Sequence, residues 1–117
     1  MVKVLISAQT TDTTSAGENI EGLSDIVVQF IRANHSSGNT VFSIDGSNDG
    51  TNWVTGIACQ DLTATASATF VTGKTLSSAT TAAVRVPDGF KMIRAVADVT
   101  TDGQNSVILS CSKKAVS

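Results

Sequence analysis

The chain has 117 residues and a formal net charge of −2, and 15% of its side chains are charged. This length suits one domain with a single core and is short for two domains of ordinary size. The near-neutral charge gives no indication of a nucleic acid or an acidic membrane surface as partner. No segment is apolar over the length that a bilayer requires, so no membrane span is expected.

The composition favours strands over helices. Ser, Thr and Ala are abundant, whereas Leu, Glu and Lys are few, and the only proline is Pro87. Thr, Val and Ile suit a pleated sheet. Acidic residues are more frequent up to Asp61 and basic residues beyond it. Either folding interleaves the two halves and cancels this asymmetry, or opposite charges steer copies of the chain together.

The N-terminal part predicts two strands separated by a polar segment. Residues 2–8 form the first expected strand, and the Thr-rich residues 9–16 are expected to be a loop or an arm. Residues 25–33 form the most apolar expected strand. Because residues in a strand alternate between its faces, Ile26 shares one face with Val28 and Phe30.

The second face of this strand is the candidate interface. It carries Val27 and Ile31 around Gln29, and a strand that is apolar on both faces is covered inside the domain or by another subunit. We expect contact with a partner. The alternative is that the segments 9–16 and 77–81 cover this face within the chain.

The middle of the chain predicts a strand, a tight turn and a second extended segment. Residues 35–39 are expected to be a hairpin connection, and the following strand carries Phe42 inward. The sequence Asn48-Asp49-Gly50 is a strong turn signal. Trp53 then begins an extended segment and is expected to pack into the core, with a sugar-binding platform as the alternative.

The remaining strands follow the same pattern of alternation and turns. Ala66, Ala68 and Phe70 are expected to point inward, Pro87-Asp88-Gly89 is a turn, and residues 101–104 form a final hairpin before Leu109. About eight short strands predict one all-β domain over residues 1–117, an antiparallel β-sandwich of jelly-roll type. Its expected core anchors are Phe42, Trp53, Phe70 and Leu109.

Arg94 is an unusual charge in the middle of a predicted strand. It shares a face with Met92 and Val96, so it requires a partner. A local ion pair with Asp98 is one explanation, and contact with a neighbouring subunit is the other. We therefore add Arg94 to the candidate interface.

No pattern of catalytic or cofactor-binding residues is recognised. Residues 45–51 follow the start of a calcium-binding EF-hand loop, but Gly56 stands where the closing Glu is needed, so a plain turn is favoured over an incidental calcium site at Asp45 and Asp49. His35 is the only histidine, which leaves no nucleophile–base pair to expect. Cys59 and Cys111 are expected to be buried free thiols rather than a disulfide.

Two stretches carry a family resemblance. SIDGSNDGTNWV at residues 43–54 and VRVPDGFKMIRAVADVTTDGQNSVILSCS at residues 84–112 resemble small β-sandwich proteins of tailed-bacteriophage virions, such as decoration, head-fibre and tail proteins. The turn with its following Trp is also similar to discoidin-type carbohydrate-binding jelly rolls. The first resemblance implies no catalytic residue, so none is transferred.

The expected function follows from the first resemblance. We expect a non-enzymatic virion protein without cofactor, most simply a decoration protein that binds the major capsid protein or another virion protein on the outer shell and forms a homo-oligomer. The segment 9–16 and the first strand are the expected contact. The alternative is a carbohydrate-binding module of a tail or fibre that binds a host glycan.

Overall fold

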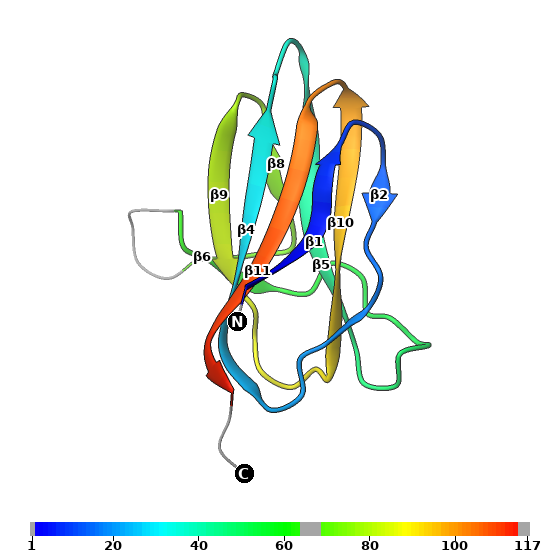
Figure 1. Ribbon diagram of the computed structural model, residues 1–117, viewed down its shortest axis with the longest axis vertical. Coiled ribbons are helices and arrows are strands. Elements are labelled where there is room, and N and C mark those ends of the chain that lie inside the picture. Colours follow the sequence, from blue (N-terminus) through cyan, green and yellow to red (C-terminus); the bar gives the residue numbers. More distant parts are fainter. Residues whose placement is uncertain (1, 64–68, 115–117) are drawn as a thin grey trace.

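A computed structural model of the chain describes residues 2–63 and 69–114. It is an antiparallel β-sandwich, so the predicted all-β sandwich is confirmed, whereas the jelly-roll connectivity stays a prediction. Two sheets face each other (Figure 1). Sheet A has the strand order β1-β11-β4-β9-β6-β7, and sheet B has the order β2-β10-β5-β8 with β3 beside β10. No described segment is a helix long and apolar enough to cross a membrane.

The described residues form eleven strands rather than about eight, because several connections pair briefly with their neighbours. The strands are β1 (Val2–Gln9), β2 (Thr13–Thr14), β3 (Glu18–Asn19), β4 (Leu23–Ala33), β5 (Gly38–Ser47), β6 (Cys59–Asp61), β7 (Phe70–Val71), β8 (Lys74–Leu76), β9 (Thr80–Arg85), β10 (Met92–Thr101) and β11 (Gln104–Lys114). The segment 9–16 is therefore not a free arm. It crosses from β1 to sheet B and pairs with β10 through β2.

The core lies between the sheets and follows the alternation of β4, β5, β10 and β11. Phe30 of β4 and Phe42 of β5 stack across the sandwich with ring centroids 5.0 Å apart. Phe42 and Leu109 are fully buried. Cys59 and Cys111 are buried and form no disulfide, as expected, and burial raises the pKa of the Cys59 thiol to about 11.

Two core assignments made from the sequence are wrong. Phe70 is 64% exposed, because in β7 it is Val71 that packs against the core. A shift of one residue in a strand moves each side chain to the opposite face. Ala66 and Ala68, which were expected to share the inward face with Phe70, lie outside the described residues. Trp53 is half-buried and lies outside the core, since it stacks on Arg94.

Residues 34–37 and 102–103 connect strands of different sheets, so neither is the hairpin predicted from the sequence. The first joins β4 to β5 and the second joins β10 to β11, both at the upper end in Figure 1. We call these two connections the arches. Each needs a glycine: Gly38 has φ 79° and Gly103 has φ 112°. A Cβ atom at Gly103 would lie 2.7 Å from Nη1 of Arg32.

Ion pairs close both open sides of the sandwich. Lys3 of β1 contacts Glu18 of β3 at 2.7 Å, and Lys74 of β8 contacts Asp61 of β6 at 2.8 Å. In each case one strand belongs to sheet A and the other to sheet B. Among the described residues, four ion pairs join a base beyond Asp61 to an acid up to Asp61, which shows that folding interleaves the two halves: Lys74–Asp61, Arg85–Asp25, Lys91–Glu21 and Arg94–Asp45.

Candidate functional site

The outer face of sheet A carries apolar side chains on β1, β11 and β4, and a further one, Phe70, on the edge strand β7. Because β1 pairs with β11 and β11 pairs with β4, the registers Val2–Ser110–Val27 and Val4–Ile108–Gln29 put these residues in two rows on one face. Val2 and Val4 are 73% and 54% exposed. We call this surface the apolar face; it consists of Val2, Val4, Val27, Gln29, Ile31, Ile108 and Phe70.

Two segments were expected as possible covers of this face. Residues 9–16 lie elsewhere, and residues 77–81 are exposed and lead into β9, where Thr81 pairs beside Ile31 in the sheet. Residues 9–16 run along β10 of sheet B, where Thr13 pairs with Ala97 and the Ser15 N–H donates to Ala95 O at 2.8 Å. Val27 and Ile31 stay half-buried and Gln29 is exposed. Monomeric proteins seldom expose a broad apolar patch without a functional reason. The apolar face is therefore the first candidate site.

Charge on the apolar side of sheet A is balanced within the chain. Arg85 donates from Nε to Asp25 Oδ1 at 3.0 Å and from Nη1 to Gln60 Oε1 at 3.4 Å. Arg85 pairs in register with Val27 and with Gln60, and Gln60 pairs with Phe70, so Arg85 and Gln60 lie between Val27 and Phe70 on this face. An exposed pair of this kind contributes little to stability, but it leaves no net charge that would repel a partner.

Arg94 does not belong to the apolar face, because β10 lies in sheet B. The four candidate interface residues thus separate into Val27, Gln29 and Ile31 on one sheet and Arg94 on the other. The ion pair expected with Asp98 is also wrong. Arg94 pairs in register with Asp45 of β5, and its Nε donates to Asp45 Oδ2 at 2.9 Å.

Trp53 and Arg94 form a stacked pair on the outer face of sheet B. The segment after the 48–50 turn folds back along β5, where Gly46 and Val54 exchange backbone hydrogen bonds. This brings the Trp53 ring to 4.4 Å from the guanidinium carbon of Arg94. A planar guanidinium stacks favourably on an aromatic face. Trp53 is consequently not a bare sugar-binding platform, since Arg94 occupies one side of its ring.

The turn that resembled the start of an EF-hand is held by the protein's own donors. Asp49 accepts hydrogen bonds from the N–H groups of Asn52 and Thr51 and from the Asn52 side chain, and these hold the pKa of Asp49 well below its ordinary value. Asp45 is occupied by Arg94 and the Gly56 N–H. Among the residues that the structure describes, no group of three or more His, Cys, Asp or Glu side chains could hold a metal ion.

A buried polar network at the arches was missed in the sequence. The Arg32 side chain is fully buried. It donates to His35 Nδ1 at 3.1 Å, Thr40 Oγ1 at 2.6 Å and Ser37 O at 2.9 Å, and it contacts Asp102 at 3.3 Å. The signal was present, because Arg32 continues the inward series of Ile26, Val28 and Phe30.

Asp102 and Asn105 complete this network across the two arches. Asp102 accepts from the backbone N–H groups of Ser36 and Ser37, and the Ser36 bond is the first cause that lowers the pKa of Asp102 below its ordinary value. Asn105 is fully buried and accepts from Thr40 Oγ1 at 2.6 Å. The network fixes one arch against the other. Because His35 is engaged within this network, we regard both the network and His35 as structural.

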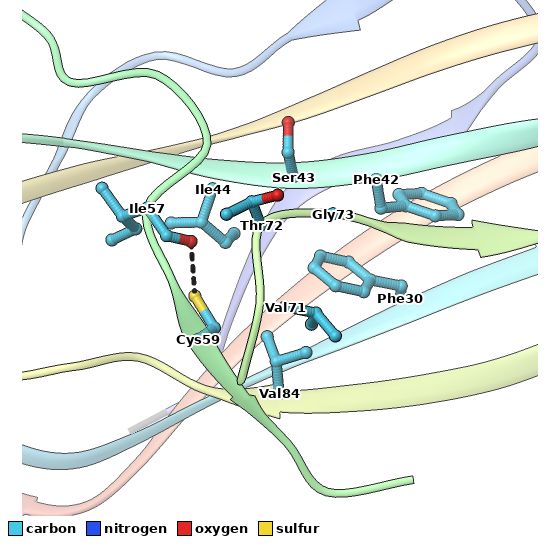
Figure 2. A pocket seen from close by; sticks show the side chains of 10 residues that line it. All are labelled: Phe30, Phe42, Ser43, Ile44, Ile57, Cys59, Val71, Thr72, Gly73 and Val84. Carbon is cyan, nitrogen blue, oxygen red and sulfur yellow. Dashed lines mark hydrogen bonds between the residues drawn. The ribbon is translucent and has the colours of Figure 1, made fainter. Parts of the chain in front are cut away.

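A small apolar cavity lies between the two sheets. Figure 2 shows Phe30, Phe42, Ile57, Cys59 and Val84 around it, from both sheets. Its volume is about 10 Å³, which is close to the lower limit for a single water molecule. A substrate or cofactor therefore has no room between the sheets at this point.

Comparisons with known proteins give the fold and no family. No family model matches the chain, and no curated protein matches it in sequence. Among solved structures, the SPBc2 prophage-derived protein YomS is similar, with a TM-score of 0.63 over 94% of this chain and 92% of that chain. Its sequence is 14% identical to this one. The chain therefore has the fold of a prophage-derived protein.

Proposed function

We propose that this chain is a non-enzymatic structural protein of a bacteriophage particle that docks on another virion protein through its apolar face. The observation that carries the proposal is the group of valines and isoleucines on β1, β11 and β4 that remain partly or largely exposed on the outer face of sheet A. The chain shares its fold with a prophage-derived protein, which is consistent with this role, but the shared fold alone does not indicate the role.

The energetics of the apolar face suit a docking role. Full burial of one Val or Ile side chain contributes about 1.5–3 kcal/mol. Val27 and Ile31 are half-buried already, so each gains a part of this amount, whereas Val2 and Val4 gain more. Phe70, at 64% exposure, adds an aromatic anchor at the opposite edge of the sheet. Together these side chains suffice for a specific contact in an array of many copies.

More specifically, we propose that the chain is a capsid decoration protein. The partner would be the major capsid protein on the outer shell of the virion. The alternative partner for the apolar face would be a second copy of the chain. An enzymatic role has little support, since Arg32 donates to Nδ1 of His35, the single histidine of the chain, at an arch.

The test is a double substitution on the apolar face, Val27→Thr with Ile31→Thr. Threonine keeps the shape of a β-branched residue and removes the apolar contact. We expect the variant to fold and its occupancy on purified particles, or its self-association, to fall about tenfold. Val41→Thr with Val54→Thr is the matched control, because both valines are exposed on the sheet B side.

Two results would contradict the proposal. One is a double variant that unfolds before any loss of association, which would mean that Val27 and Ile31 serve the chain's own core. The other is a double variant that keeps the occupancy of the parent while the control pair on the sheet B side loses it. In that case the contact lies on the opposite sheet.

A further inference from the structure

The strand β1 is a long unpaired edge of sheet A. It pairs with β11 on one side (Figure 1), and on its other side no described strand or loop bonds the backbone of residues 2–4. The other edge strands that the structure describes, β2, β3, β7 and β8, have two or three residues each, whereas β1 has eight. Unpaired N–H and C=O groups along such an edge are a template for a strand of another chain.

The usual protections of an edge strand are weak at residues 2–4. Bulges and lysines commonly prevent edge strands from pairing with each other. The register of β1 against β11 becomes irregular only after Val4, and the charge of Lys3 is balanced by Glu18 at 2.7 Å. Val2 and Val4 are largely exposed on the outer face, on either side of Lys3 in the sequence. Residues 2–4 therefore form a short extended segment that is apolar on one face and charge-balanced on the other.

A second copy of the chain fits this segment by symmetry. Residues directly opposite each other in an antiparallel pair share a face of the sheet. Val2 of one copy can therefore lie opposite Val4 of the other, with Lys3 opposite Lys3. This arrangement has a two-fold axis at Lys3 and uses the whole regular part of the strand. Each Lys3 brings its own Glu18 carboxylate to the axis, so the charges there balance.

We propose that two copies of the chain associate edge to edge through β1, in an antiparallel register centred on Lys3. The pairing joins two six-stranded sheets and makes their apolar faces continuous. It does not rest on the docking function of the apolar face, since its contacts are backbone groups and the flanks of Val2 and Val4. The contact is small beside a standard interface. The dimer is therefore weak in solution and is favoured where many copies are held close together.

Disulfide trapping in the full chain tests the register. In the proposed dimer the two residues at position 3 lie directly opposite each other, with Cα atoms about 4.5–5.5 Å apart, a separation that a disulfide can bridge. Lys3→Cys should therefore form a covalent dimer with oxidised glutathione as the oxidant. The native Cys59 and Cys111 are buried in the fold.

Two exposed positions serve as matched controls for the trapping. Ser7→Cys lies on the same strand, but in the proposed register its two copies are roughly 26 Å apart along the strand. Thr75→Cys lies on β8, an edge strand of sheet B. Both variants should form covalent dimers at least about tenfold more slowly than Lys3→Cys.

A charge exchange tests the two-fold axis without cysteine. Lys3→Glu leaves only carboxylates at the axis, so sedimentation equilibrium should show dimerisation weakened about tenfold. Lys3→Glu with Glu18→Lys restores the balance of charge, and dimerisation should return to the level of the parent. Val27→Thr with Ile31→Thr lies away from the β1 edge. Added to Lys3→Cys, this pair should leave the trapping unchanged, which separates the edge contact from docking through the apolar face.

Three outcomes would overturn the proposal. The first is a parent chain that sediments as a monomer at about 1 mM. The second is equal trapping of Lys3→Cys and Ser7→Cys, which would mean random collision or another register. The third is loss of trapping at position 3 when Val27→Thr and Ile31→Thr are added in a folded chain, which would place the contact between copies on the apolar face.

Discussion

Two arginine–aspartate pairs use the same residue types in opposite ways. At the arches the Arg32 side chain is fully buried and Asp102 is 34% exposed, whereas on the outer face of sheet B Asp45 is 4% exposed and Arg94 is 27% exposed. In each pair the buried member has its charged groups bound by the protein, and the exposed member reaches solvent. Arg32 therefore serves the fold with its whole guanidinium, while the Nη groups of Arg94 have no hydrogen-bond partner among the described residues.

The largest effect is expected from removing the buried member at the arches. Arg32→Ala leaves a cavity and takes a partner from Thr40, His35 and Asp102, so it should lower the free energy of unfolding by about 3–5 kcal/mol. Urea denaturation followed by far-UV circular dichroism measures this. A loss below about 1 kcal/mol would mean that water replaces the guanidinium, and the two pairs would then not differ as described.

A smaller effect is expected at the second pair. Among the described residues, Arg94→Ala leaves the Gly56 N–H as the one donor to the buried Asp45 carboxylate, which should cost about 2–4 kcal/mol. Adding Asp45→Ala removes that unpaired charge, so the double variant should be more stable than Arg94→Ala alone. Urea denaturation of the single and double variants measures this difference in stability. If the double variant is the less stable of the two, Asp45 stabilises the fold through its hydrogen bond with the Gly56 N–H and not through Arg94.

The smallest effect concerns pH at Asp102. Its pKa is lowered by the Ser36 N–H, with help from Ser37 and from Arg32 and His35. A carboxylate with a depressed folded-state pKa gives stability that is present above its unfolded pKa, about 3.9, and is lost as pH falls through its folded pKa. The parent should therefore exceed Asp102→Asn in thermal midpoint near neutral pH.

This difference in thermal midpoint should shrink as the solution is acidified below the unfolded pKa. The matched control is Asp12→Asn, since Asp12 accepts from the backbone Val99 N–H outside the arches. A difference between the parent and Asp102→Asn that persists unchanged in strong acid would show that Asp102 acts by packing rather than by charge.

Regular alternation made the central strands predictable. Every second residue is apolar from Ile26 to Phe30 in β4 and from Ile93 to Val99 in β10, and the turn at Asn48-Asp49-Gly50 has donors and acceptors close in sequence. Val27, Gln29 and Ile31 could be placed on one face for the same reason. The short strands gave no such signal. β7 has two residues, too few to fix a register, so Phe70 was placed in the core although Val71 faces it.

By itself, the sequence determined the strands that build the core and the face on which their side chains lie, because alternation is a local property of an extended backbone. Only the tertiary structure decided which charges meet. Asp45 and Arg94 are far apart in the chain, as are Arg32 and Asp102, and each pair forms because strand register or the two arches bring the residues together. The same holds for Trp53. The sequence predicts a position in the core for its ring, whereas in the fold the ring lies against the Arg94 guanidinium.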